Sequence, residues 1–198
     1  MTMSTACLKR SGRPNHQPYR HFQAHHLTAQ EIEANKQEVI ELLQSVKREN
    51  MDQVIRYLKT TPFFEAPNAI HGDSHHKWPG GLAQHCLGVC RLMLQREEID
   101  RESAIVVGLL HDISKANVYE RKANKVWTYR AKPLHWNGDG SRSVKLLTTL
   151  LHLKLTRGEA EAILHHMHRR GNVTKAILSN PLYQAIRDCD RANSKRGD

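Results

Sequence analysis

The sequence predicts an all-α fold made of one helical domain. Apolar residues recur at helical spacing in segment after segment, capping patterns precede several of these segments, and strand-like alternation is confined to residues 125–130. Strands do not alternate with helices and no segment repeats, which argues against α/β and repeat architectures. With 198 residues, the chain is long enough to bury a sizeable core.

Charge is unevenly placed along the chain, whose net charge is +10. Residues 1–30 contain basic residues and no acidic residue. We expect residues 1–27 to form a basic, disordered tail and residues 28–198 to form the folded domain. The start also resembles an organelle transit segment, although it lacks an amphipathic pattern. The positive charge suits a phosphate-containing small molecule or nucleic acid, and charge alone does not choose between them.

The four cysteines form no Cys-x-x-Cys pair, which predicts reduced thiols in a reducing compartment and no disulfides. No apolar stretch approaches the roughly 20 residues that span a bilayer, and the first 30 residues hold no hydrophobic signal core. We therefore expect a soluble, cytoplasmic protein without a membrane partner. The sequence favours no particular oligomeric state.

The first predicted helix begins after Thr28, because residues 28–31 have the spacing of a capping box. Its apolar side chains Ile32, Val39, Leu43 and Val46 share one face. A second helix is expected over residues 52–59, with Asn50 as its cap and Pro62 following its end.

Two further helices follow a long loop at residues 62–81, which is rich in proline and glycine and has a composition typical of site-lining loops. The third helix is expected over about residues 82–95 and the fourth over residues 103–116. The fourth is almost entirely apolar in its first half, so we expect it to be central. Its Gly108 predicts a close approach by a neighbouring helix.

Helical periodicity is lost between residues 117 and 140, where a small hairpin and an extended loop both remain open. A fifth helix is expected over residues 141–153. A second capping box at residues 156–159 opens a sixth helix, which carries His165 and His166. Asn180 and Pro181 have the pattern of a cap and a first-turn proline, and they begin a last helix that runs through Asp190.

The apolar run at residues 104–110 ends on two potential metal ligands, His111 and Asp112. Together with His85, His166 and Asp190 they suggest a metal site gathered from several helices. Imidazole and carboxylate ligands suit Mn, Fe, Co, Ni or Zn with coordination positions left open. Such an ion makes bound water a stronger nucleophile and neutralises charge on a phosphoryl group, which predicts an enzyme acting on phosphate esters.

Lys115 follows Asp112 by three residues and His111 by four, which places it on their face of a helix. There its ammonium group can hold a nonbridging phosphate oxygen. We therefore predict catalytic roles for Asp112 and Lys115. Further substrate-binding candidates are Arg169, Arg170, His76 and Lys77.

The order His85, His111-Asp112, Asp190 resembles that of the HD-domain superfamily of metal-dependent phosphohydrolases. Over roughly residues 75–194 the chain is most similar to a group of small stand-alone HD proteins. The matching stretches are Pro-Gly-Gly-Leu at residues 79–82, His-Asp-Ile-Ser-Lys at 111–115, residues 155–167, and Cys189-Asp190 with Ser194. The third stretch points to His166 rather than His165 as the functional histidine.

This resemblance implies a helical HD bundle that hydrolyses a phosphomonoester or phosphodiester, in a nucleotide or related small molecule. It implies one or two divalent ions, Mg included, with Asp112 as the bridging ligand if there are two. One motif departs from the group, because residues 138–143 read Gly-Asp-Gly-Ser-Arg-Ser where the group has Gly-His-Gly-Glu-Lys-Ser. Asp139 then occupies the histidine position, unless His135 reaches in, and a carboxylate there favours harder ions.

Two other functions remain open alongside the enzyme. A noncatalytic nucleotide sensor would keep the fold and bind its ligand without turnover. A nucleic-acid-binding module would use the basic residues 1–27, and its binding would weaken steeply with salt.

Overall fold

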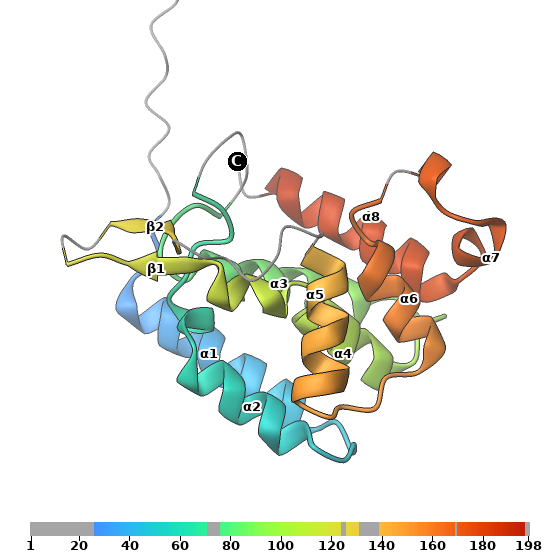
Figure 1. Ribbon diagram of the computed structural model, residues 1–198, viewed down its shortest axis with the longest axis horizontal. Coiled ribbons are helices and arrows are strands. Elements are labelled where there is room, and N and C mark those ends of the chain that lie inside the picture. Colours follow the sequence, from blue (N-terminus) through green and yellow to red (C-terminus); the bar gives the residue numbers. More distant parts are fainter. Residues whose placement is uncertain (1–25, 71–75, 124–125, 131–138, 169, 197–198) are drawn as a thin grey trace, which may run out of the picture.

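The computed structural model describes residues 26–70, 76–123, 126–130, 139–168 and 170–196, apart from the side chains of residues 139, 170, 195 and 196. The described chain is helical with one two-stranded sheet, which confirms the all-α prediction (Figure 1). The α-helices are α1 (Ala29–Gln44), α2 (Met51–Thr60), α3 (Gly81–Met93), α4 (Arg101–Leu110), α5 (Asp139–Lys145), α6 (Arg157–His165), α7 (Lys175–Leu178) and α8 (Pro181–Arg196). The 3-10 helices are η1 (Pro62–Phe64), η2 (Ile113–Asn117) and η4 (Arg170–Asn172), and η3 (Leu146–Leu150) is a π-helical turn.

Both predicted capping boxes are present. The Thr28 hydroxyl accepts a hydrogen bond from the Glu31 amide at 3.2 Å, and the Glu31 carboxylate accepts one from the Thr28 amide at 2.8 Å. Thr156 and Glu159 repeat the pattern at 3.2 and 2.8 Å. Because each box satisfies amides that have no partner within the helix, the starts of α1 and α6 are set by local sequence.

Asn50 is the N-cap residue of α2, as predicted, but its side chain does not make the capping bond. Its backbone is left-handed, with φ of 65°. The side-chain amide of Asn50 instead donates a hydrogen bond to the backbone oxygen of His152 at 2.9 Å. The Asn50 side chain therefore joins two distant turns, while its backbone occupies the cap position of α2.

The fourth helix ends earlier than predicted. α4 stops at Leu110 and His111 caps it, whereas a continuous helix to residue 116 was expected. Asp112 then adopts φ of −108° and ψ of 15°, and η2 follows. Successive side chains on an α-helix diverge by about 100°. The break allows the adjacent side chains of His111 and Asp112 to reach one point, with Nε2 and Oδ2 3.5 Å apart.

Two other departures lie in the C-terminal half. The predicted helix over residues 141–153 is divided into α5 and η3, whose π-helical bond joins the amide of Leu151 to the oxygen of Leu146 at 3.0 Å. The short helix α7 was not predicted. Its cap is Thr174, which accepts from the amide of Ile177 at 3.4 Å. α7 has only four residues, which is too short to show the apolar periodicity that reveals a helix in sequence.

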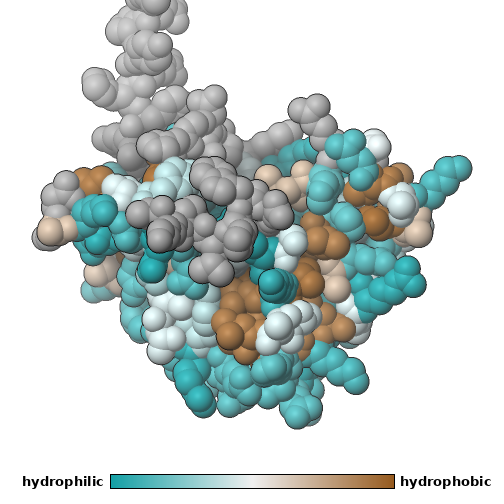
Figure 2. Space-filling model, viewed as in Figure 1, coloured by the Kyte–Doolittle hydropathy of each residue, from teal (hydrophilic) through white to brown (hydrophobic). Residues whose placement is uncertain are grey.

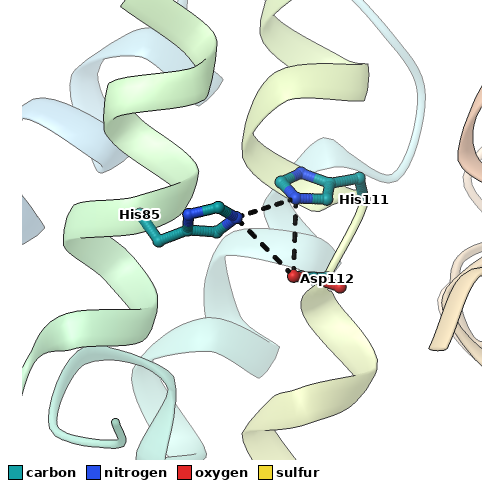
Figure 3. Close-up of side chains that lie close together, drawn as sticks. All are labelled: His85, His111 and Asp112. Atoms are coloured by element: carbon teal, nitrogen blue, oxygen red, sulfur yellow. Dashed lines mark hydrogen bonds and ion pairs between the residues drawn. The ribbon is translucent and has the colours of Figure 1, made fainter. Parts of the chain in front are cut away.

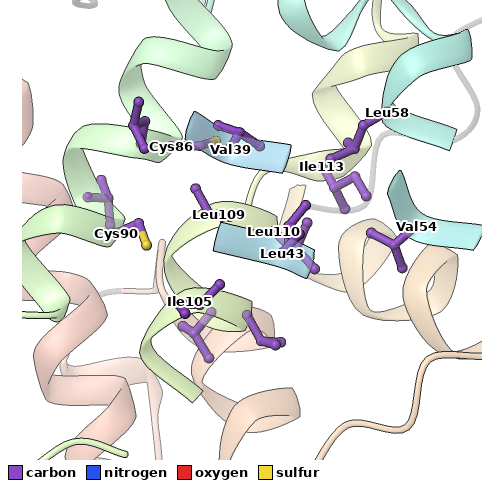
Figure 4. Packing of buried hydrophobic residues seen from close by; sticks show 14 of the residues in the cluster. Val39, Leu43, Val54, Leu58, Cys86, Cys90, Ile105, Leu109, Leu110 and Ile113 are labelled. Carbon is purple, nitrogen blue, oxygen red and sulfur yellow. The ribbon is translucent and has the colours of Figure 1, made fainter. Parts of the chain in front are cut away.

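α4 is the central helix, as expected, and it packs against α1, α3, α6 and α8. Figure 4 shows part of the core, to which α1, α2, α3, α4 and η2 contribute side chains such as Leu43, Leu58, Cys86, Leu109 and Ile113. A Cβ at Gly108 would lie 2.6 Å from Cys90 Cα, so only glycine allows α3 and α4 to approach this closely. This finding confirms the expected close approach.

The hairpin alternative is also confirmed. β1 (Tyr119–Arg121) and β2 (Trp127–Tyr129) pair antiparallel, with Tyr119 opposite Tyr129, and they lie at the edge of the molecule (Figure 1).

The face in Figure 2 is largely hydrophilic with a hydrophobic area near its centre. Within the described residues, no helix combines the length and hydropathy needed to cross a membrane. The three described cysteines are free thiols.

Candidate metal centre

Three side chains from α3 and the end of α4 form a buried cluster (Figure 3). His85 Nε2 lies 3.4 Å from His111 Nε2 and 3.8 Å from Asp112 Oδ2. With the His111 to Asp112 contact at 3.5 Å, one ligand atom of each residue lies within 4.8 Å of the others. This spacing is compatible with three ligands of one cation.

Two further predicted residues join this cluster from distant helices. Asp190 Oδ1, on α8, lies 3.3 Å from His85 Nε2. His166 Nε2, at the end of α6, lies 3.6 Å from Asp112 Oδ1. The structure thus brings together the five side chains that we refer to as the cluster: His85, His111, Asp112, His166 and Asp190.

Exposure within the cluster is greatest at Asp190. The Asp190 side chain is 20% exposed, whereas the other four are at most 4% exposed. Lys115, beside Asp112, is 16% exposed. Among these described side chains, Asp190 and Lys115 are therefore the ones nearest to solvent.

Backbone carbonyls orient two of the three imidazoles. His111 Nδ1 lies 3.0 Å from the oxygen of Gly108, and His166 Nδ1 lies 2.7 Å from the oxygen of Ile163. Since a carbonyl oxygen only accepts, each Nδ1 carries a proton. In the neutral ring, Nε2 then presents its lone pair to the cluster, which is the arrangement that a metal ligand needs.

Two polar atoms in the cluster lack hydrogen-bond partners. Asp112 Oδ1 and His166 Nε2 are buried, and neither makes a hydrogen bond. Leaving a buried polar group unsatisfied costs about 1–3 kcal/mol. A divalent cation would satisfy both atoms, and a set of imidazole and carboxylate donors is one that such ions accept. The residues present therefore fit a metal ion.

The charges of the cluster also suit a cation. Burial, together with His166 and His85, lowers the pKa of His111 to about 4, so this ring is neutral at neutral pH. Burial opposes ionisation of Asp112, but Lys115 and the neighbouring histidines outweigh it and hold its pKa well below the usual range. Burial likewise opposes ionisation of Asp190, whose pKa is lowered by His85 and His111. Both carboxylates are therefore ionised.

His166 differs from His111 in its protonation. Burial acts to lower its pKa, but contact with Asp112 outweighs burial and raises the pKa above the ordinary histidine value. A cation bound at His166 would therefore compete with a proton.

Lys115 lies beside the cluster, as the sequence predicted. Its Nζ is 2.8 Å from Asp112 Oδ2 and 3.1 Å from the side-chain oxygen of Asn68. Asn68 is itself held by the Tyr119 hydroxyl, which donates to its backbone oxygen at 3.3 Å. Sequence reasoning missed Asn68 because it lies in a loop without periodicity.

The loop before α3 brings His76 against the cluster. The His76 ring is 5.5 Å from the His85 ring between centroids and 5.3 Å from that of Trp78. His76 has φ of 59°, a conformation that costs a non-glycine residue about 1–3 kcal/mol and that often marks functional sites. A Cβ at Gly81 would lie 2.1 Å from the His76 oxygen, so glycine is required beside it. Lys77, also predicted to contact substrate, is exposed.

Four predicted residues cannot be placed at the cluster. His135 and Arg169 lie outside the described residues, and the side chains of Asp139 and Arg170 do so as well. The backbone of Asp139 begins α5, and the next residue, Gly140, packs closely on α6. A Cβ at Gly140 would lie 2.3 Å from the oxygen of Ile163, the same oxygen that orients His166. The roles of these four residues remain predictions.

Sequence reasoning also missed Asn193, which contacts His85 from α8. Its Nδ2 lies 3.1 Å from His85 Nδ1, and its side chain is buried. The available signal was its position three residues after Asp190, on the same face of one helix.

A separate cavity of about 580 Å³ lies between α2, η2, α5 and η3. Its described lining includes Tyr57, Ser114, Lys145 and Leu150 and no residue of the cluster. Ser143 is buried on the inner side of α5, where its hydroxyl lies 3.2 Å from that of Ser114. The described lining of this cavity is thus separate from the cluster.

A comparison with protein-family models matches residues 82–192 to the HD domain. The match spans all five residues of the cluster. A search of curated proteins found no match, and neither did a search of solved structures. Because the matched residues make up more than half of the 198-residue chain and form the helices that carry the cluster, the chain belongs to the HD-domain family.

Proposed function

We propose that this protein is a metal-dependent phosphohydrolase that cleaves a phosphomonoester or phosphodiester of a nucleotide or related small molecule. HD-domain proteins are mostly hydrolases, and the family supports a phosphate-containing substrate. The observation that carries the proposal is the facing pair of buried atoms, Asp112 Oδ1 and His166 Nε2, which lie 3.6 Å apart without a hydrogen bond in a cluster of histidine and aspartate.

Different residues of the cluster would bind the first and the second metal ion. His85, His111, Asp112 and Asp190 would fix one ion, chosen from Mn, Fe, Co, Ni, Zn and Mg. His166, with Asp139 or His135, would hold a second ion or orient the substrate. A divalent ion held there supplies an activated water as nucleophile and neutralises charge on the phosphoryl group.

The chain's own residues account for substrate placement. A phosphate entering past Asp190 would meet the Lys115 ammonium, which lies at the rim of the cluster and is held in place by Asn68. Such a fixed charge would stabilise the negative charge that develops on nonbridging oxygens. Burial of the other ligands would exclude bulk water and strengthen these interactions.

Metal reconstitution tests the proposal. Ion-free protein would be loaded separately with each candidate ion and assayed against nucleotides, phosphomonoesters and phosphodiesters. We expect bound metal and turnover in the wild type and loss of both in Asp112→Asn. Asp188→Asn is the matched control, because Asp188 is on the same helix as Asp190 but its side chain is 51% exposed. Absence of bound metal in the wild type would contradict the proposal.

A nucleotide sensor without catalysis is the alternative, favoured by the aspartate at position 139 where similar HD proteins have histidine. The same experiment separates the two functions. A sensor would bind nucleotide in the metal-loaded state, with no product formed from any member of the substrate panel.

A further inference from the structure

The cavity between α2, η2, α5 and η3 has room for a small molecule. Its volume of about 580 Å³ lies within the range of roughly 300–1,000 Å³ that is typical of ligand pockets. Figure 2 shows a hydrophobic area on the same face, between α2 and α5 as Figure 1 labels them. Because the described lining includes no residue of the metal cluster, a ligand held here would not need the proposed metal centre.

Apolar side chains form one part of the lining. Val118 is buried, Leu146 is half-buried, and Leu150 is 61% exposed. An apolar ring or chain that lies against these side chains would remove them from water, and this burial favours binding.

The charged side chains of the described lining are all positive. Arg142 and Lys145 both line the cavity from α5, and the described lining includes no aspartate or glutamate. Lys145 is exposed, and it makes no ion pair with any residue that the structure describes. The lining is therefore complementary to an anion, since no carboxylate there would repel it.

The cations and the apolar side chains occupy successive parts of one face. Arg142, Leu146 and Leu150 follow one another at intervals of four residues along α5 and η3. Side chains at this spacing lie on the same side of a helix, and all three line the cavity. A ligand along this face would meet positive charge beside α5 and apolar surface beside η3.

Tyr57 adds a neutral phenol to the cavity. Burial raises its pKa to about 12, although the positive charge of Arg130 acts in the opposite direction. The phenol therefore keeps its proton at neutral pH. Its oxygen accepts a hydrogen bond from the side-chain amide of Asn117, which also lines the cavity. The phenol hydrogen can then be donated to an oxygen of a bound anion.

We propose that this cavity is a second binding site, which takes a small organic anion with an apolar body and a sulfonate, carboxylate or phosphate group at one end. The apolar body lies against Leu146 and Leu150, and the anionic group pairs with Arg142 and Lys145. This inference goes beyond the proposed function, and it holds whether or not the cluster binds metal.

Anilinonaphthalene sulfonate is a suitable probe, because it joins apolar rings to one sulfonate. Phenylnaphthylamine has the same rings without the sulfonate. Each probe would be titrated into the full chain and followed by fluorescence, with calorimetry to count sites for the sulfonate. We expect the ion-free wild type to bind the sulfonate saturably at one site per chain.

Reversing the charge at position 145 tests where the sulfonate binds. Lys145→Glu should weaken its binding roughly tenfold, because an attraction at an exposed position becomes a repulsion. Binding of phenylnaphthylamine should change little. Lys154→Glu is the matched control, since it changes the net charge equally at an exposed residue outside the described lining. It should leave the affinity for both probes near that of the wild type.

Leu150 offers a second pair of variants. Leu150→Glu and Leu150→Gln have side chains of nearly the same shape, and the site is 61% exposed, so both changes suit the folded chain. The glutamate variant should bind the sulfonate more weakly than the glutamine variant. This pair decides if Lys145→Glu does not fold, and equal binding by the two variants would overturn the inference.

The remaining outcomes separate this inference from the proposed function. Absence of saturable sulfonate binding in the wild type would overturn the inference, as would equal weakening in Lys145→Glu and Lys154→Glu. Binding only to zinc-loaded protein would assign the sulfonate to the metal cluster, which would also overturn the inference but leave the proposed function intact. A wild type that binds the sulfonate at this cavity but binds no metal would contradict the proposed function alone.

Discussion

The guanidinium of Arg48 donates two hydrogen bonds to the carboxylate of Glu159, each with an N to O distance of 2.7 Å. Glu159 also completes the capping box of α6 and accepts from the Ser103 hydroxyl, near the start of α4, at 2.8 Å. One carboxylate therefore joins the beginnings of two helices whose other ends carry His111 and His166. The link thus holds α4 and α6 together at the ends opposite these two histidines.

Replacing this carboxylate should destabilise the fold. Glu159→Gln keeps the shape of the side chain but removes the bidentate partner of Arg48, whose side chain is 15% exposed, and leaves only its longer contact with Glu102 at 3.5 Å. We expect a loss of about 3 kcal/mol in the free energy of unfolding, near the lower end for breaking a buried pair. Urea unfolding at pH 7 measures it. Glu161→Gln, which breaks the surface pair with Arg157, is the control and should change little. Equal effects of the two changes would contradict the prediction.

The contribution of Glu159 should depend on pH. Burial opposes its ionisation, but hydrogen bonds from Arg48, Thr156 and Ser103 outweigh burial and lower its pKa. Since the folded-state pKa lies below the unfolded value of about 4.3, the stabilisation is present above that value. It is lost as pH falls through the folded-state pKa. We expect the stability gap between wild type and Glu159→Gln, measured by urea unfolding, to narrow below about pH 4. A constant gap would show that the charge is not its source.

Removing the charge of Lys115 should impair turnover while sparing metal binding. If its ammonium stabilises the phosphoryl group, Lys115→Met should lower kcat by about a hundredfold to a thousandfold. Lys115→Arg should recover part of the loss. Metal content is measured on the same samples, because Lys115 also contacts Asp112 at 2.8 Å. A fall in activity that merely follows loss of metal would argue against a direct role.

Metal removal should destabilise the wild type. A ligand that binds only the folded state adds about 2.7 kcal/mol at a free concentration one hundred times its Kd. We therefore expect chelation to lower the Tm, and zinc to restore it, in the wild type. Asp112→Asn should respond weakly to both treatments, because it lacks the carboxylate at the centre of the cluster. Equal zinc responses in the two proteins would place the bound ion elsewhere.

Adding a methyl group at Gly108 should strain the core. A Cβ there would lie 2.6 Å from Cys90 Cα, and backbone cannot yield as a flexible side chain can. Gly108→Ala should cost about 1–3 kcal/mol of stability, the range for overpacking a core. Gly171→Ala, with nothing within 4 Å of its added Cβ, is the control. Urea unfolding compares both with the wild type.

Local signals predicted most helices well because capping and periodicity act within a few residues. The boxes at Thr28 and Thr156 begin α1 and α6 as expected, and the apolar stripe after Gly81 forms α3. The errors occur where distant contacts compete with local preference. Asparagine is a residue type that often caps a helix with its side chain, yet the Asn50 side chain donates a hydrogen bond to the backbone oxygen of His152, 102 positions later. No local pattern could reveal this partner.

The sequence by itself determined the helical class, the chemical types of the candidate ligands and their order along the chain, because these follow from short-range periodicity and residue identity. Only the tertiary structure decided that the fourth helix breaks at His111, that Asp190 and Lys115 are partly exposed beside buried ligands, and that Asn193 meets His85 from 108 positions away. These features depend on how helices pack, and packing joins residues whose separation in sequence carries no spatial information.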